Sequence, residues 1–270
     1  MSAHQILFLG TGNAIVTRCY NTCFILKTEK TKLLVDAGGG NGILAQLDKC
    51  RISLSELHDL YLTHAHTDHI LGAVWVLRMV IHCMKDKTYE GLFNVYSHDK
   101  VLEVLVQICR LTLPAKDLAF LGRRVFLHEI KNEDAFQAGD ISLTCFDIFS
   151  TKEKQFGFRA LLPDGQSVVC LGDEPYNEQN RPYAENADWL LCEAFCLYHD
   201  RAVFRPYEKH HSTAWEAGRL AARLHGKNLV LYHTEDRTLA TRKKTYTAEA
   251  KQHFPGNVFV PDDLETIDLD

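Results

Sequence analysis

Thr63-His64-Ala65-His66-Thr67-Asp68-His69 is the densest group of potential metal ligands in the sequence, with three histidines and one aspartate inside six residues. Apolar runs precede and follow it. Imidazole and carboxylate groups are common ligands of zinc and related divalent ions. Without an ion, such groups would be desolvated and poorly partnered. The alternative is a polar loop of solvated histidines, but ligand number, type and spacing all agree with a metal site.

The spacing inside this stretch favours two ions over one. His64 and His66 are two residues apart, so an extended backbone turns both imidazoles to the same face, where one ion can bind both. Asp68 and His69 are neighbours, and their side chains must diverge. If both also bind metal, a second ion accommodates them more easily than one crowded site, and two-metal hydrolases hold their ions about 3.5–4 Å apart.

Length and composition are those of an ordinary globular chain. The 270 residues are 46% apolar and 24% charged, and no linker, repeat or low-complexity segment divides them. We therefore expect a single domain over residues 1–270. The net charge of -5 argues against a general binder of nucleic acid, although a local basic patch is compatible with it.

Cysteine usage and apolar runs bear on the compartment. The nine cysteines, an odd number without a CxxC pair, suit reduced thiols better than a disulfide framework. The chain enters a strand almost at once without an apolar signal region, and no window approaches the roughly 18 apolar residues of a membrane helix. The sequence thus predicts a cytoplasmic protein that does not enter a membrane.

Strand and helix patterns alternate along the chain. Apolar, β-branched and aromatic runs predict strands at 5–9, 22–27, 32–36, 60–62, 93–96, 124–128, 141–149, 156–162, 167–171, 189–194, 229–232 and 258–260. Longer patterns predict helices at 70–84, 99–111, 213–225 and 238–253, and Thr213 and Glu216 have the spacing of a capping box.

Polar residues stand at the ends of five of these strands: Asp36, His64, Asp173, Glu193 and His233. Functional sites gather at such strand ends in layered α/β folds, so these side chains are expected to converge on one edge. Asp36 either supports the neighbouring histidines or forms a turn. Asp173 is placed to bridge two ions, although a Gly-Asp pair alone indicates only a turn.

The segment His64-Ala65-His66-Thr67-Asp68-His69 matches His-x-His-x-Asp-His, the signature of the metallo-β-lactamase superfamily, which the chain resembles. Within it the chain looks most like the ribonuclease Z branch and its phosphodiesterase relatives. The likeness runs from about Ile6 to His233 and includes Gly10-Thr11-Gly12, Val35-Asp36-Ala37-Gly38, Phe156-Gly157-Phe158-Arg159, Gly172-Asp173, Cys192-Glu193-Ala194 and His211-Ser212-Thr213.

This resemblance implies a four-layer α/β/β/α sandwich and a set of metal ligands. His64 and His66 would bind one ion, and Asp68, His69 and His233 the other. Asp173 would bridge the two. The ions would be Zn²⁺ or Mn²⁺, one or two per chain.

The resemblance also implies catalytic roles and partners. A hydroxide held by the ions would be the nucleophile, oriented by Asp68. His211 would donate a proton to the leaving oxygen while Glu193 holds its imidazole, unless His211 is simply a solvated histidine at a helix start. The resemblance implies a small-molecule or nucleotide phosphate ester as the substrate, with RNA as a second choice. It also implies a homodimer.

Two features depart from this family pattern. The family expects a further histidine shortly before Gly157, but residues 149–155 contain none, and Phe149 or Thr151 occupies the place. His210 or His128 could substitute; otherwise the first ion has only His64, His66 and Asp173. The protruding basic arm that grips transfer RNA is also missing, since 15 residues separate Gly157 from Asp173.

The sequence as a whole predicts a metal-dependent hydrolase, foremost a phosphodiesterase resembling ribonuclease Z without its arm. A hydrolase of carboxylic esters, thioesters or lactones using the same centre is one alternative. A non-catalytic, metal-dependent sensor that lost turnover with the missing histidine is another. Substrate contacts are expected from residues 85–91, 174–188 and 198–209, where Arg201, Arg205 and Lys209 could meet an anion or remain solvated.

Overall fold

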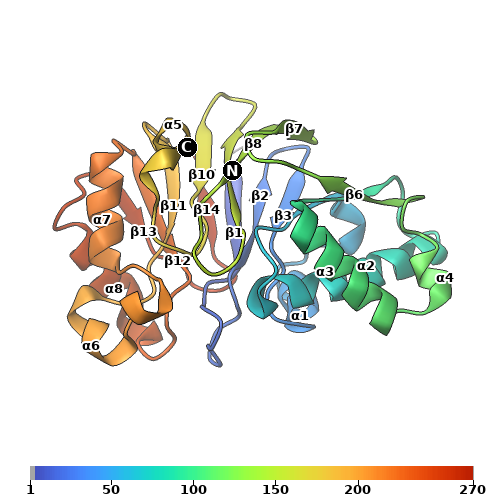
Figure 1. The fold of residues 1–270 in the computed structure, drawn as a ribbon, viewed down its shortest axis with the longest axis horizontal. Helices are drawn as coiled ribbons and strands as arrows, with labels where there is room; N and C mark the ends of the chain where they lie inside the picture. Colours follow the sequence, from blue (N-terminus) through green and yellow to red (C-terminus); the bar gives the residue numbers. More distant parts are fainter. Residues whose placement is uncertain (1–3, 270) are drawn as a thin grey trace.

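The computed structural model describes residues 4–269 and is built around two seven-stranded sheets (Figure 1). The first has the order β14-β1-β2-β3-β4-β5-β6, with β1 at Gln5–Gly10, β2 at Cys23–Lys27, β3 at Lys32–Val35, β4 at Asp59–Tyr61, β5 at Phe93–Ser97, β6 at Val125–Glu129 and β14 at Thr266–Asp268. The second has the order β13-β12-β11-β10-β9-β8-β7, with β7 at Ala135–Ala138, β8 at Ile141–Asp147, β9 at Phe156–Leu161, β10 at Ser167–Cys170, β11 at Trp189–Glu193, β12 at Asn228–Tyr232 and β13 at Asn257–Phe259.

Both faces of each sheet are buried because apolar residues occupy successive positions of the strands. Ile6 and Phe8 of β1 lie in the core between the sheets, whereas Leu7 and Leu9 lie under the helices of the first sheet. This follows from the two-residue repeat of a strand, which sends neighbouring side chains to opposite faces. Both sheets are therefore covered on both sides.

Helices cover the outer face of each sheet (Figure 1). The first sheet carries α1 (Gly42–Lys49), α2 (Thr67–Lys85), α3 (Asp99–Thr112) and the short α4 (Ala115–Leu118). The second carries α7 (Ala214–Arg223) and α8 (Leu239–Ala250), with the short α5 (Arg181–Ala184) and α6 (Arg201–Phe204) near its ends. The predicted four-layer α/β/β/α sandwich is confirmed.

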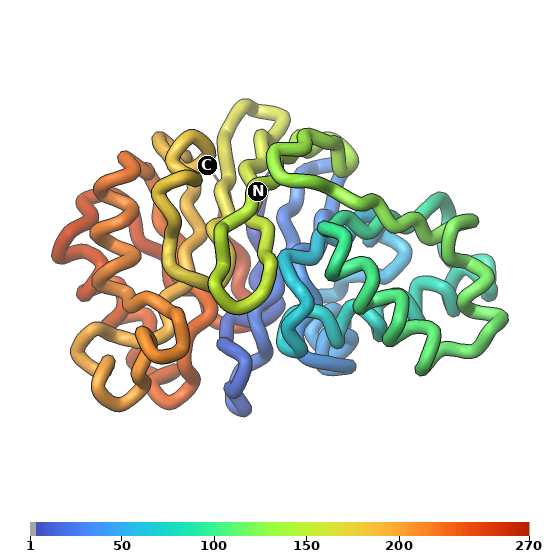
Figure 2. Tube along the Cα trace, viewed as in Figure 1, coloured from blue at the N-terminus to red at the C-terminus, as the bar shows by residue number. Residues whose placement is uncertain are grey.

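Parallel strands bring many chain segments to one edge of the molecule. In the first sheet β3, β4, β5 and β6 are parallel, and in the second β10, β11, β12 and β13 are parallel. Their carboxyl ends meet at the lower edge in Figure 1, and the segment between β1 and β2 extends past this edge (Figure 2). The predicted convergence of the strand ends is therefore present.

Some predicted elements differ from the structure. Strands β7 and β14 were not expected, because AFQA and TID are short and lack a clear strand pattern. The strand predicted at 141–149 ends at Asp147, and Phe149 has a left-handed backbone (φ 59°) that cannot continue a strand. The capping box of Thr213 and Glu216 is present, but its helix ends at Arg223.

All nine cysteines carry free thiols. Among residues 4–269, no helix has both the length and the apolar character needed to cross a membrane.

Candidate metal centre

Side chains from both sheets meet at the edge where the parallel strands end. β4 ends at Tyr61, and His66 is the N-cap residue of α2. Asp68 and His69 occupy the first turn of this helix, where the positive end of the helix dipole favours an ionised carboxylate. From the second sheet, Asp173 follows β10 and His233 follows β12. The structure thus brings together residues from three strand ends and the first turn of α2.

The side chains form two groups that have the chemistry of metal ligands. His64, His66 and Asp173 make the first group, and Asp68, His69 and His233 make the second. Within each group, one potential ligand atom per residue lies within 4.8 Å of the others. All six residues are the ones that the sequence singled out, and all except His66 are buried.

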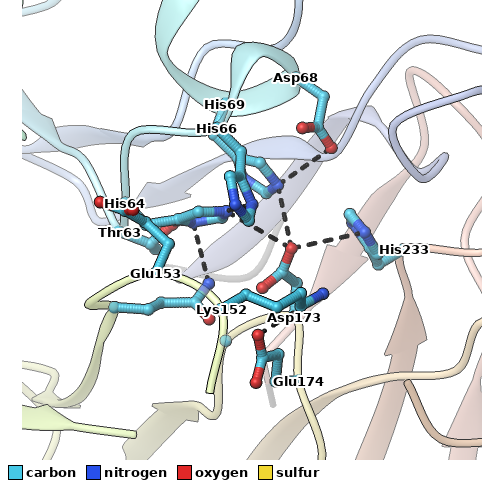
Figure 3. A network of polar contacts seen from close by, with 12 residues as sticks. Thr63, His64, His66, Asp68, His69, Lys152, Glu153, Asp173, Glu174 and His233 are labelled. Carbon is cyan, nitrogen blue, oxygen red and sulfur yellow. Dashed lines mark hydrogen bonds and ion pairs between the residues drawn. The ribbon is translucent and has the colours of Figure 1, made fainter. Parts of the chain in front are cut away.

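Asp173 lies between the two groups (Figure 3). Its Oδ2 atom is 3.5 Å from Nε2 of His64, 3.5 Å from Nε2 of His69 and 3.6 Å from Nε2 of His233. One carboxylate oxygen is therefore nearly equidistant from imidazoles of both groups. This is the place that a carboxylate shared by two ions has to occupy.

Burial and charge set the protonation of these groups. Burial lowers the pKa of His233 to about 3 and holds the pKa of His64 well below its usual range. Burial opposes ionisation of Asp173, but His64, His69 and His233 hold the pKa of its carboxyl well below its usual range. Burial likewise opposes a charge on His69, but the carboxylates of Asp68 and Asp36 raise its pKa well above the ordinary value.

This arrangement fits a divalent cation. A metal requires neutral imidazoles and ionised carboxylates, the state favoured for His64, His233 and Asp173. The Nε2 atom of His69 is buried without a hydrogen-bond partner, although it lies 3.3 Å from Oδ2 of Asp68. The buried carboxylates of Asp68 and Asp173 both face this nitrogen, and two buried negative charges need a positive charge between them.

Asp36 supports both groups from behind. Its Oδ2 atom lies 2.7 Å from Nδ1 of His69 and accepts a 2.8 Å hydrogen bond from the hydroxyl of Thr63, while Oδ1 accepts one from the Thr63 N–H. The Thr63 hydroxyl in turn lies 2.9 Å from Nδ1 of His64. One carboxylate therefore fixes the orientation of His69 directly and of His64 through Thr63.

The backbone at two of these strand ends is strained. Asp36 and His233 both adopt the left-handed conformation, with φ of 54° and 57°. Residues with a Cβ rarely do so, and the conformation costs on the order of 1 kcal/mol or more. Each turn directs its side chain from the end of a strand into the gap between the sheets.

The segment 149–155, which lacks the histidine expected of the family, contacts the centre differently. The Gln155 amide nitrogen lies 2.9 Å from Nδ1 of His64. Ser150 donates a hydrogen bond of 2.7 Å to the buried carboxylate of Glu174, and the Thr151 N–H donates another of 3.2 Å. The segment is thus attached to the loop that carries Asp173.

Neither suggested replacement for the missing histidine joins a ligand group. His210 is exposed, and its Nδ1 lies 3.1 Å from the Thr151 hydroxyl. His128 is on β6, where it stacks on Tyr96 and lies 2.9 Å from Oδ1 of Asn94. Within residues 4–269, the first group therefore consists of two histidines and Asp173.

His211 and Glu193 lie beside the second group. The His211 ring is buried, its centroid lies 5.3 Å from that of His233, and its Nδ1 faces Oε2 of Glu193 at 3.6 Å. The other Glu193 oxygen accepts the Ser212 N–H. Burial lowers the pKa of His211, but the adjacent Glu193 carboxylate outweighs this and raises it above the ordinary value.

Sequence analysis missed several residues that build this centre. Thr63 could have been found, because it is the polar residue directly before the ligand cluster at a strand end. Gln155 and Glu174 gave no signal, since their partners are distant in sequence: Gln155 is 91 positions from His64. Phe195 was missed too; its ring stacks on His211, with centroids 4.6 Å apart and planes at 10°.

The predicted substrate loops are only partly at this edge. Residues 85–91 follow α2, whose 19 residues span about 28 Å, so they lie at the far end of that helix from the ligands. Arg201 packs on Tyr198, and Arg205 lies 3.6 Å from Glu208. Lys209 is nearer to the ligand groups: its ammonium lies 4.7 Å from the centroid of the Phe195 ring, which stacks on His211.

Comparisons with known proteins agree with this geometry. The family model described as anti-Pycsar protein Apyc1 matches residues 4–254. A ribonuclease Z of Halorubrum lacusprofundi is 26% identical, with 98% of this chain and 97% of that protein covered. The metallo-β-lactamase fold protein YhfI of Bacillus subtilis superposes with a TM-score of 0.78 at 19% identity, with 98% of both chains covered. The short form of human tRNase Z gives a TM-score of 0.72 at 21% identity, with 98% of this chain and 99% of that one covered. The chain therefore has the metallo-β-lactamase fold.

Proposed function

This chain belongs to the family described as anti-Pycsar protein Apyc1, and we propose that it is a metal-dependent phosphodiesterase. The observation that carries the proposal is the position of Asp173, whose Oδ2 lies about equally far from His64, His69 and His233. A carboxylate shared by two ligand groups, next to an imidazole held by Glu193, suits hydrolysis of a phosphate ester.

We assign His64, His66 and Asp173 to one divalent ion, and Asp68, His69, His233 and Asp173 to the other. When bound, such ions activate water for attack and neutralise charge on phosphoryl oxygens. Mixed imidazole and carboxylate ligands suit Zn²⁺ or Mn²⁺. We expect the first ion to be held more weakly, because residues 4–269 offer it only three ligands.

The protein's own groups divide the proton transfers. Asp68, ionised at the start of α2, accepts a hydrogen bond from the attacking water and orients it. His211 donates a proton to the leaving oxygen, and Glu193 keeps its ring in place and favours its protonated form. General acid catalysis of this kind contributes about 10²–10⁴-fold to a rate.

We expect a small-molecule or nucleotide phosphate ester as substrate. Relatives named ribonuclease Z support RNA or phosphate esters as the class. The connection between β9 and β10 is the short turn Leu162–Gln166, so no arm for a large RNA projects there. Support is therefore greater for a compact phosphodiester than for transfer RNA.

The test combines metal content with two substrate classes. The protein is reconstituted with Zn²⁺ or Mn²⁺, its bound metal is measured by plasma mass spectrometry, and turnover of bis(p-nitrophenyl) phosphate is compared with that of a thioester. We expect phosphodiester turnover that falls at least 100-fold in His211→Ala, without loss of metal. His82→Ala is the matched control, because His82 is exposed and lies on α2 beside the exposed Asp86, at 3.2 Å. Equal turnover in His211→Ala, or turnover of the thioester alone, would overturn the proposal.

A further inference from the structure

The loop between β8 and β9, residues 148–155, carries two lysines whose ammonium groups lie in different places. Nζ of Lys154 is 2.6 Å from Oδ1 of Asp99, at the start of α3, so its charge is paired beside the first sheet. Nζ of Lys152 reaches the second sheet instead, where it lies 3.5 Å from Oε1 of Glu174. The two lysines thus form a matched pair in which only Lys152 lies on the side of the second sheet.

Glu174 is the buried carboxylate that holds this loop in place, and it directly follows Asp173 in the chain. Its Oε1 atom accepts a hydrogen bond of 2.7 Å from the Ser150 hydroxyl. Its Oε2 atom accepts one of 3.2 Å from the Thr151 N–H. The 3.5 Å between Lys152 and Oε1 is longer than a usual hydrogen bond. The ammonium therefore balances the charge of this carboxylate, but neither oxygen needs it as a hydrogen-bond donor.

The ammonium of Lys152 lies close to the proton donor that we assign. It donates a hydrogen bond of 3.1 Å to the backbone carbonyl of Lys209, two residues before His211. Burial and the Lys152 charge both oppose the raised pKa of His211, so the ammonium is within electrostatic range of this imidazole. Figure 3 shows Lys152 at the Asp173 and Glu174 end of the polar network. Its side chain is 29% exposed and an ammonium has three donors, so at least one donor stays free for a ligand.

The proposed reaction adds negative charge where negative charge is already present. Burial opposes ionisation of Asp68 and Asp173, but neighbouring imidazoles hold the pKa of both carboxyls below the usual range. A phosphodiester brings one more negative charge, and attack by hydroxide adds another. His211 transfers its proton to the leaving oxygen, so the reaction consumes its charge. No step consumes the charge of Lys152, which is therefore suited to stabilise negative phosphoryl oxygens.

We propose that Lys152 is a catalytic residue whose ammonium binds a non-bridging phosphoryl oxygen of the substrate. Lysine recognises phosphate as a point charge, and its flexible stem and three rotatable donors adapt to the position of the oxygen. The inference rests on the proposed function. It also gives the departure from the family pattern a consequence, because the loop that lacks the expected histidine ligand contributes a contact to the substrate.

The test replaces each lysine of the loop with methionine, which keeps a long side chain and removes its charge. The proteins are loaded with Mn²⁺ and assayed with bis(p-nitrophenyl) phosphate. Lys152→Met should lower kcat/KM about 10–100-fold, because it removes a hydrogen bond between charged groups. Lys154→Met is the matched control and should stay within twofold of the wild type, since its ammonium pairs with Asp99. Metal content, measured by plasma mass spectrometry, should be the same in all three proteins.

An ion pair with a purely structural role is the alternative, and a double-variant cycle separates the two. If Lys152 acts only through Glu174, Lys152→Met has no further effect once Glu174→Gln is present. If the ammonium contacts the substrate, the loss of kcat/KM in that background stays at least tenfold. The glutamine amide oxygen can still accept from Ser150, so the loop keeps this attachment.

Four results would overturn the inference: an unchanged kcat/KM in Lys152→Met, an equal loss in Lys154→Met, a loss of metal in Lys152→Met, or a loss that disappears in the Glu174→Gln background.

Calorimetry with inorganic phosphate gives a readout that does not depend on turnover. Metal-loaded Lys152→Met should bind phosphate at least fivefold more weakly than the wild type, and Lys154→Met should bind it as the wild type does. This measurement uses single variants, so it also decides if the double variant does not fold. If the wild type cleaves no phosphodiester, the proposed function fails, and phosphate binding alone decides the role of Lys152. Equal binding in Lys152→Met, or no binding in the wild type, refutes the contact.

Discussion

Asp36 lies 2.7 Å from His69, with its Oδ2 atom against Nδ1, while the Nε2 atom of the same imidazole faces Asp68 and Asp173. The bond fixes the proton on Nδ1 and leaves Nε2 as the ligand atom. A carboxylate behind a ligating histidine also increases its basicity. The orientation of the second ligand group therefore depends on a residue that cannot touch the ion.

Asp36→Asn should weaken metal binding about 10–100-fold, because an amide can neither hold the proton on Nδ1 as firmly nor accept from Thr63 as strongly. Competition with a chelating dye measures the affinity. Asp140→Asn is the matched control: Asp140 also accepts from a threonine, Thr28, at 2.7 Å, but lies in the turn between β7 and β8. An unchanged affinity in Asp36→Asn would contradict the role assigned to this carboxylate.

Gln155→Ala should reduce the affinity of the first ion about tenfold and leave the second ion in place. The amide contacts Nδ1 of His64 on the side away from Asp173, and an amide can present either oxygen or nitrogen there. Titration with Mn²⁺, followed by electron paramagnetic resonance, separates tight from weak ions. Gln179→Ala, which changes an exposed glutamine in the short 3-10 helix Glu178–Asn180 before α5, is the control. Equal loss of both ions would show that Gln155 acts on the whole fold and not on His64.

The parts of the structure that follow local rules could be predicted from the sequence. Apolar runs predicted most of the strands, the family resemblance implied the four layers, and the strand-end positions of Asp173 and His233 predicted their convergence. The contact of Gln155 with His64 spans 91 positions and follows no residue spacing. Phe195 was missed for another reason: a phenylalanine after a buried strand looks like any other core residue. The role expected for residues 85–91 was wrong because α2 carries them away from the edge at which it starts.

Removing the metal should lower the melting temperature. An ion present at 100 times its Kd stabilises the folded state by about 2.7 kcal/mol. For a chain of this size each kcal/mol shifts the melting temperature by about 2–4 °C, so chelation should lower it by about 5–10 °C. Asp173→Asn should show a smaller effect of chelator, since we assign this carboxylate to both ions. If chelator does not change the melting temperature of the wild type, the protein holds no resident ion that stabilises it.

Stability should also depend on pH through His98, which is outside the ligand groups. His98 is fully buried, and its Nε2–H donates to the carbonyl of Lys154 at 2.9 Å. Burial lowers the pKa of His98 below its ordinary value of about 6.5. The unfolded chain therefore binds this proton more readily, so stability present above pH 6.5 is lost as the pH falls.

His98→Gln should accordingly be less stable than the wild type at pH 7.5, by about 1 kcal/mol for the lost hydrogen bond, but should lose less stability on going to pH 5.5. Urea unfolding of the metal-loaded proteins at the two pH values measures both differences. His82→Gln serves as control, because His82 is an exposed histidine on the surface of α2, 3.2 Å from the exposed Asp86. If His98→Gln and the wild type lose the same stability over this range, the buried imidazole is not the group that titrates.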